Sequence, residues 1–204
     1  MRRVIVLLAL VLAGCGQAER AYTPGGGAAR PPTAGATEPE PMASEPRPSG
    51  PESVTIGGGK LRVNIDWPAK RDPLLEVITD YYLASRKALV SGSDRYLSDL
   101  DIELSAAPEV YDWVHRYTEQ EKTVKGTARL YNLRVAAVVG KGAQINACVD
   151  ESETRLISTR TGKAVVPQPD WVRTPYLQAA LAHRGDDGVW RIRGLRYDME
   201  GCPG

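Results

Sequence analysis

The chain has 204 residues, of which 42% are hydrophobic and 25% charged, and its formal net charge at pH 7 is +1. Charges of both signs are interspersed and neither sign forms a long block, which argues against nucleic acid or an acidic lipid surface as a partner. About 150 residues follow residue 55, which is the usual size of one domain with one core.

The amino terminus has the pattern of an export signal. Arg2 and Arg3 precede an almost unbroken apolar run over residues 4–13. A helix needs about 20 residues to cross the core of a bilayer, so this run is too short to be a permanent transmembrane anchor. We therefore predict a signal peptide over residues 1–14 that is cleaved off.

The signal ends on Leu12-Ala13-Gly14-Cys15. This sequence resembles the bacterial lipobox, in which the thiol of the cysteine takes a diacylglycerol. The resemblance implies that Cys15 is lipidated and that the chain is held on the extracytoplasmic face of the cell membrane. An ordinary signal peptide that happens to contain a cysteine is the alternative. Gly16 gives no inner-membrane retention signal, and whether the envelope has one membrane or two stays open.

The segment over residues 15–55 is rich in proline, glycine and small polar residues and almost lacks large apolar side chains. Such a stretch cannot bury enough apolar surface to offset the ordering of its backbone, so we predict a disordered linker after the lipidated Cys15. About 40 residues of flexible chain have a root-mean-square span of roughly 35 Å. The linker would therefore lift a domain clear of the lipid headgroups.

Two amphipathic helices are predicted next. Asp72-Pro73 supplies a capping residue followed by proline at the first helical position, and apolar residues then recur with helical spacing as far as Gly92. This pattern predicts a helix over residues 73–91. A second helix is predicted from Pro108 to near Glu121.

After residue 123 the apolar pattern switches to alternation, which predicts three hairpins. The first joins the series from Leu133 to Val139 and the series from Ala143 to Val149 through Gly140-Lys141-Gly142. The second joins residues 155–160 and 163–166, and the third joins residues 176–184 and 189–199 through a Gly-Asp-Asp-Gly turn. Helices followed by strands favour an α+β domain over residues 56–204, in which the N-terminal helices pack on one face of a curved antiparallel sheet.

This order of elements, closing on Asp187-Gly188-Val189-Trp190-Arg191-Ile192, resembles the cystatin-like cone of the nuclear-transport-factor-2 superfamily. Cys148-Val149-Asp150, Thr161-Gly162-Lys163 and Gly201-Cys202 are similar to secreted or lipoprotein members of that group from actinobacteria. The resemblance implies a fold and a compartment. It fixes no function, because the superfamily contains isomerases, dehydratases, binding modules and subunits of envelope complexes.

With Cys15 lipidated, Cys148 and Cys202 remain as an even pair in an oxidising compartment, and we predict that they form a disulfide. Two buried free thiols are the alternative. We expect no metal site, because there is no C-x-x-C spacing and no histidine near the cysteines. The acidic stretch Asp150-Glu151-Ser152-Glu153 lacks the spacing of a calcium loop and is predicted to be a solvated turn.

The histidines give no catalytic set. His115 lies off the apolar stripe of its helix, and His183 lies at the end of a strand beside a polar turn, so solvated side chains are expected for both. The inward positions of the predicted strands are mainly Ala, Val, Ile and Leu, and no acid–base pair can be assembled from spacing. No catalytic residue and no cofactor is therefore predicted.

Four aromatic residues could line a ligand pocket at the mouth of the predicted cone: Tyr81, Tyr82, Trp190 and Tyr197. The alternative is that they form the core itself, since a chain without phenylalanine must fill its interior with Tyr and Trp.

Three functions stay open. The leading hypothesis is a non-enzymatic accessory lipoprotein of the cell surface that binds an envelope protein or a small apolar ligand. An enzyme of the isomerase or dehydratase kind would use Asp150, Tyr81 or Tyr82 as its polar groups. The third reading is a structural subunit of a secretion or conjugation complex.

Overall fold

The computed structural model describes residues 50–202. The predicted signal peptide, Cys15 and residues 16–49 lie outside the described residues. The first described element is strand β1 (Pro51–Ile56), which pairs with β2 (Leu61–Asp66) in an antiparallel hairpin. The predicted end of the linker at residue 55 is therefore too late, because residues 51–55 form part of β1.

The two predicted helices are present and differ from the prediction only at their ends. Helix α1 spans Leu75–Ser91 and α2 spans Ala107–Thr118, and a short 3-10 helix, η1 (Asp94–Tyr96), lies between them. The Asp72 carboxylate accepts the backbone N–H of Leu74 at 2.9 Å, just before α1. Gly92 ends α1 with a φ of 70°, in the left-handed region that glycine adopts without steric cost.

Four more strands complete one six-stranded sheet: β3 (Lys122–Val139), β4 (Gly142–Ser158), β5 (Tyr176–Arg184) and β6 (Trp190–Asp198). The strands lie in the order β1-β2-β3-β4-β5-β6, and each pair of neighbours is antiparallel except β2 and β3. Both helices lie in the connection between β2 and β3, so the chain crosses over and returns in the same direction. The α+β class is confirmed, but the sheet is mixed and not wholly antiparallel.

Two of the predicted strand details need correction. The second hairpin forms but is short: its first arm is the end of β4, and around the antiparallel bridge between Ile157 and Ala164 the N–H of Ser158 donates to the carbonyl of Lys163 at 2.9 Å and that of Val165 to the carbonyl of Leu156 at 3.0 Å. A second 3-10 helix, η2 (Asp170–Val172), lies in the segment that leads to β5. The alternation predicted as far as Val139 also fails, because register shifts along β3 turn this residue outward and leave it 74% exposed.

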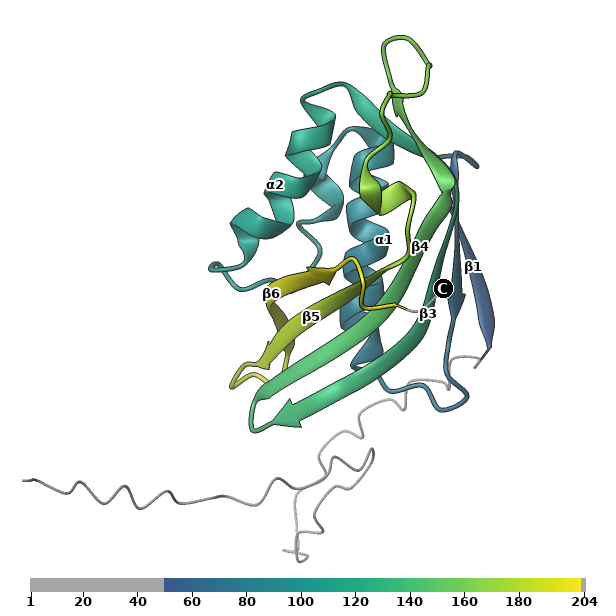
Figure 1. Cartoon of the computed structure of the whole chain (residues 1–204). Coiled ribbons are helices and arrows are strands. Elements are labelled where there is room, and N and C mark those ends of the chain that lie inside the picture. Colours follow the sequence, from purple (N-terminus) through teal and green to yellow (C-terminus); the bar gives the residue numbers. More distant parts are fainter. Residues whose placement is uncertain (1–49, 203–204) are drawn as a thin grey trace, which may run out of the picture. The chain divides into compact units, whose positions relative to one another are not determined.

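The core lies between α1, α2 and one face of the sheet (Figure 1). Leu75, Ile78, Tyr82 and Leu89 form the inner face of α1, and each is at most 1% exposed. Burying side chains of this size contributes about 1.5–3 kcal/mol each, so α1 is held mainly by this face. Between residues 50 and 202 no helix is long and apolar enough to cross a membrane.

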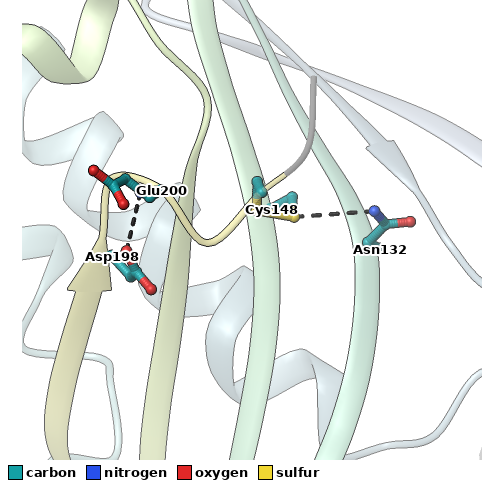
Figure 2. The surroundings of a disulfide bond; sticks show 5 residues. Asn132, Cys148, Asp198 and Glu200 are labelled. Carbon is teal, nitrogen blue, oxygen red and sulfur yellow. Dashed lines mark hydrogen bonds between the residues drawn. A yellow bond between two sulfur atoms is a disulfide. The ribbon is translucent and has the colours of Figure 1, made fainter.

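Cys148 and Cys202 form a disulfide, as predicted, with their Cα atoms 5.8 Å apart. Cys148 lies on β4, and Cys202 lies just beyond β6 in a segment that returns alongside β4 (Figure 2). The segment turns directly after β6, where a carboxylate oxygen of Asp198 accepts the backbone N–H of Glu200 at 2.9 Å. The disulfide therefore fastens the end of the described chain to the middle of the sheet.

Candidate functional site

A buried ion pair joins α1 to β4. The Nε atom of Arg86 donates to Oε1 of Glu151 at 2.7 Å, and the Nη2 atom donates to Oε2 at 2.8 Å. Arg86 is 4% exposed and Glu151 is 0% exposed. Such a parallel, two-bond contact is the strong form of an arginine–carboxylate pair, and it neutralises both charges inside the domain.

Two tyrosines complete the coordination of the carboxylate. The hydroxyl of Tyr82 donates to Oε1 of Glu151 at 2.7 Å, and the hydroxyl of Tyr176 donates to Oε2 at 3.1 Å. With the two bonds from Arg86, each carboxylate oxygen accepts two hydrogen bonds, which fills the acceptor capacity of an ionised carboxylate. The carboxylate of Glu151 therefore has no acceptor site left for a further donor.

Burial and charge fix the protonation of this network. Burial, reinforced by the negative charge of Glu151, raises the pKa of Tyr82 and of Tyr176 well above the ordinary tyrosine value. Burial by itself disfavours the charged guanidinium of Arg86, but the adjacent carboxylate outweighs that effect and raises the pKa of Arg86. The network thus holds one cation, one anion and two neutral phenols.

Aromatic rings surround the guanidinium group. Its central carbon lies 4.4 Å from the ring centroid of Trp113 on α2, 4.5 Å from that of Tyr82 and 5.5 Å from that of Trp171 on η2. The two tryptophan rings meet edge to face with centroids 5.9 Å apart, and the indole N–H of Trp171 donates to the hydroxyl of Tyr117 at 2.8 Å. These contacts hold α2 and η2 together over the ion pair.

A pocket of about 190 Å³ opens beside this network, between α1, α2, η2, β5 and β6. Most of its wall is aromatic or thioether surface, and the polar groups are few. The lining residues are Arg86, Trp113, Trp171, Tyr176, Gln178, Tyr197 and Met199. An apolar cleft with a small number of placed polar groups is the usual form of a small-molecule site.

Of the four aromatic residues predicted to line a pocket, only Tyr197 lines this one. Its hydroxyl lies 2.9 Å from that of Tyr81, which is 2% exposed and part of the core. Burial, followed by the neighbouring Tyr197, raises the pKa of Tyr81 well above its usual value. Tyr82 lies under the pocket and binds Glu151, and Trp190 lies outside it at the start of β6, opposite Arg184.

The acidic stretch after Val149 is not a solvated turn. It belongs to β4, and it places Glu151 in the interior while Asp150 stays partly exposed and accepts the backbone N–H of Ser152 at 2.9 Å. The polar groups named for an enzyme, Asp150 with Tyr81 or Tyr82, are therefore not brought together. The carboxylate that meets a tyrosine is that of Glu151.

The two histidines bind carboxylates away from the pocket. Nε2 of His115 lies 3.1 Å from a carboxylate oxygen of Asp94, and Nδ1 of His183 lies 2.9 Å from one of Glu103. The hydrogen bond from Arg193 to Glu103 lowers the pKa of that carboxyl, with a further contribution from His183. Within residues 50–202, no three His, Cys, Asp or Glu side chains are grouped so that they could hold a metal ion.

Sequence reasoning missed Arg86, Glu151 and Gln178, although each carried a signal. Arg86 lies four residues after Tyr82 and so shares its buried helix face. Glu151 continues the inward alternation predicted for residues 143–149, although the acidic residues that flank it favour a turn. Gln178 likewise occupies an inward position of β5. A polar side chain at an inward position indicates a possible binding site.

No protein-family model and no curated protein matches the chain. Solved structures do resemble it. A protein provisionally described as an aromatic ring hydroxylase from Novosphingobium aromaticivorans is 15% identical, with a TM-score of 0.45 over 65% of this chain and 94% of that one. The intermembrane space region of the chloroplast protein ARC6 is 14% identical, with a TM-score of 0.45 over 65% of this chain and 100% of that one.

A third resemblance is weaker. A protein provisionally described as a ketosteroid isomerase from Shewanella frigidimarina is 8% identical, with a TM-score of 0.33 over 60% of this chain and 92% of that one. At these identities and TM-scores the resemblances assign no function to this chain.

Proposed function

We propose that this protein is a lipid-anchored binding protein of the cell surface, which holds a small apolar molecule in the pocket between α1, α2, η2, β5 and β6. The observation that carries the proposal is the pocket itself, an aromatic-walled space of about 190 Å³ above the buried pair of Arg86 and Glu151. The lipid on Cys15 would keep this pocket at the outer face of the membrane.

Packing supports a ligand in this space. Protein interiors are close-packed, with few voids larger than a water molecule. Here Trp113 and Trp171 meet edge to face and leave room beside Tyr197. A cavity of about 150 Å³ is enough for benzene in an engineered protein, so this pocket fits one six-membered ring with a small substituent.

The chemistry of the network favours binding over catalysis. A general base needs a free lone pair within reach of the substrate. Both oxygens of Glu151 are already used by Arg86, Tyr82 and Tyr176, and the raised pKa values of the tyrosines keep both phenols protonated. The network therefore acts as a rigid floor under the pocket.

A titration with toluene, followed by the indole N–H signals of the protein in NMR spectra, tests this function. The full chain carrying Cys15→Ser, which removes the lipid, would be used. The chain has four tryptophans. Trp113 and Trp171 line the pocket, whereas Trp67 and Trp190 do not and serve as internal controls.

We expect saturable shifts of the Trp113 and Trp171 signals, because the ring current of a bound toluene acts over a few ångströms, with the other two signals unmoved. Each signal would be assigned by replacing one tryptophan with phenylalanine. Equal, non-saturating shifts of all four signals, or no shifts, would contradict the proposed function.

A further inference from the structure

We infer that the ligand of this pocket is an uncharged ring compound that carries an amide group, and that the side-chain amide of Gln178 recognises it. This inference rests on the proposed binding function and specifies its ligand. It depends on three features: the unpaired side-chain amide of Gln178, the remaining N–H donor of Arg86 and the charges around the pocket.

Gln178 lines the pocket from β5 and is 2% exposed, yet its side-chain amide makes no hydrogen bond with any residue in the described range. Two other glutamines, on or beside β4, are paired. Gln144 donates to Asn146 at 3.0 Å, and Gln168 both accepts from and donates to the backbone of Leu156. The free amide of Gln178 is thus a local exception.

The amide of Gln178 keeps contact with the pocket. In the described part of the chain, two side-chain polar atoms are inaccessible to solvent and have no hydrogen-bond partner. They are Nε of Arg71 and Oγ1 of Thr123. The amide of Gln178 also has no partner, but its atoms keep some accessible surface. Because Gln178 lines the pocket, this accessible surface faces the pocket space. A molecule in the pocket can therefore form a hydrogen bond with this amide.

Arg86 offers one more donor. A guanidinium group has five N–H donors, and its bonds to Glu151, Tyr176 and Ser85 use four of them. The remaining N–H, on Nη1, has no acceptor in the described range. A carbonyl oxygen of the ligand can accept it while the other side of the ligand's amide pairs with Gln178.

The charges around the pocket favour a neutral ligand. The cation-binding face of Trp113 is already occupied by the guanidinium of Arg86 at 4.4 Å, so a cationic ligand would meet a like charge. An anion would have to compete with Glu151, which already holds Arg86 through two bonds. A charged ligand of either sign would also lose its hydration in an apolar space without a free partner of opposite charge.

Four probes of nearly equal size separate these chemistries: toluene, benzamide, benzoate and benzylammonium. Binding to the full chain carrying Cys15→Ser would be measured by calorimetry. We expect benzamide to bind about tenfold more tightly than toluene, which corresponds to about 1.4 kcal/mol, and both charged probes to bind more weakly than benzamide.

The matched variant is Gln178→Met, which keeps the length of the side chain and removes the amide. Because the amide has no partner in the protein, this variant should unfold at the same temperature as the parent or at a higher one. It should lose the preference for benzamide, so that benzamide and toluene bind within about twofold of each other.

The outcomes separate the two proposals. If neither toluene nor benzamide binds, the proposed function is wrong. If toluene binds but benzamide binds no more tightly, or if Gln178→Met keeps the preference for benzamide, the pocket stands and the role of Gln178 is wrong. Tighter binding of benzoate or benzylammonium than of benzamide would overturn the assignment of a neutral ligand.

Discussion

Arg86 and Glu151 are charged residues in the interior of the domain, and each depends on the other. The guanidinium is held by the carboxylate and by three aromatic rings, and the carboxylate is held by the guanidinium and two phenols. Removing one member of such a pair leaves an uncompensated buried charge, whereas replacing both members removes the cost of burial as well.

Glu151→Gln should therefore lower the free energy of unfolding by about 3–5 kcal/mol, because Arg86 stays buried and charged without its anion. Chemical denaturation checks this value. The double variant Arg86→Met with Glu151→Leu should be clearly more stable than Glu151→Gln. A single variant as stable as the parent would show that the ion pair contributes little to the fold.

The raised pKa values of Tyr82 and Tyr176 predict a loss of stability at high pH. Unfolded tyrosines release their protons near pH 10, while the buried ones keep theirs, so the folded state binds more protons. Their contribution is complete below pH 10 and is lost as the pH rises from there towards the folded-state pKa values. The free energy of unfolding should fall by up to about 1.4 kcal/mol per pH unit for each tyrosine.

Urea denaturation between pH 8 and pH 11 measures this slope, and Tyr82→Phe should make it shallower. A slope that is the same in the parent and in Tyr82→Phe would mean that this phenol ionises equally in both states.

At the scale of single residues, the sequence predicted the disulfide partners, and it placed Tyr197 at a pocket mouth. It could not place Trp113 beside Trp171, because η2 lies in an irregular segment without a periodic pattern. Contacts between a helix and a distant loop depend on the path of the chain, so they cannot be predicted from the local spacing of residues.

Among the elements, both helices and the long strands could be read from periodicity because each has one buried face. The β1–β2 hairpin was not predicted. Leu61, Val63 and Ile65 alternate inward along β2, but β1 is an edge strand that is mostly exposed and begins with proline, so its sequence resembles the linker before it. The parallel pairing of β2 with β3 follows from the crossover through both helices, which became visible only once β2 was known.

The segment after β6 depends on the disulfide for its place on the sheet. Replacing both cysteines, Cys148→Ala with Cys202→Ala, opens a loop with a sequence separation of 54. In the chain-entropy model such a loop contributes about 4 kcal/mol, so the thermal midpoint should fall by roughly 10 °C. Calorimetry of the variant checks this, with the reduced parent protein as its control. An unchanged midpoint would show that the segment is held by its other contacts.

For the whole molecule, the central expectation is a binding domain carried on a lipid anchor. Cys15→Ser should move the chain from the detergent phase of a membrane extract to the aqueous phase, or leave an uncleaved precursor. Phase partitioning followed by mass determination of the N-terminus distinguishes these results. Membrane retention and processing equal to those of the parent would mean that Cys15 is not the anchor.

The most direct test of the binding site is a crystal of the protein soaked with bromobenzene, in which the bromine can be located by its anomalous scattering. We expect one bromine position inside the pocket bounded by Trp113, Trp171 and Tyr197, above an intact pair of Arg86 and Glu151. A pocket filled by the protein's own side chains, or bromine sites only elsewhere on the surface, would contradict it.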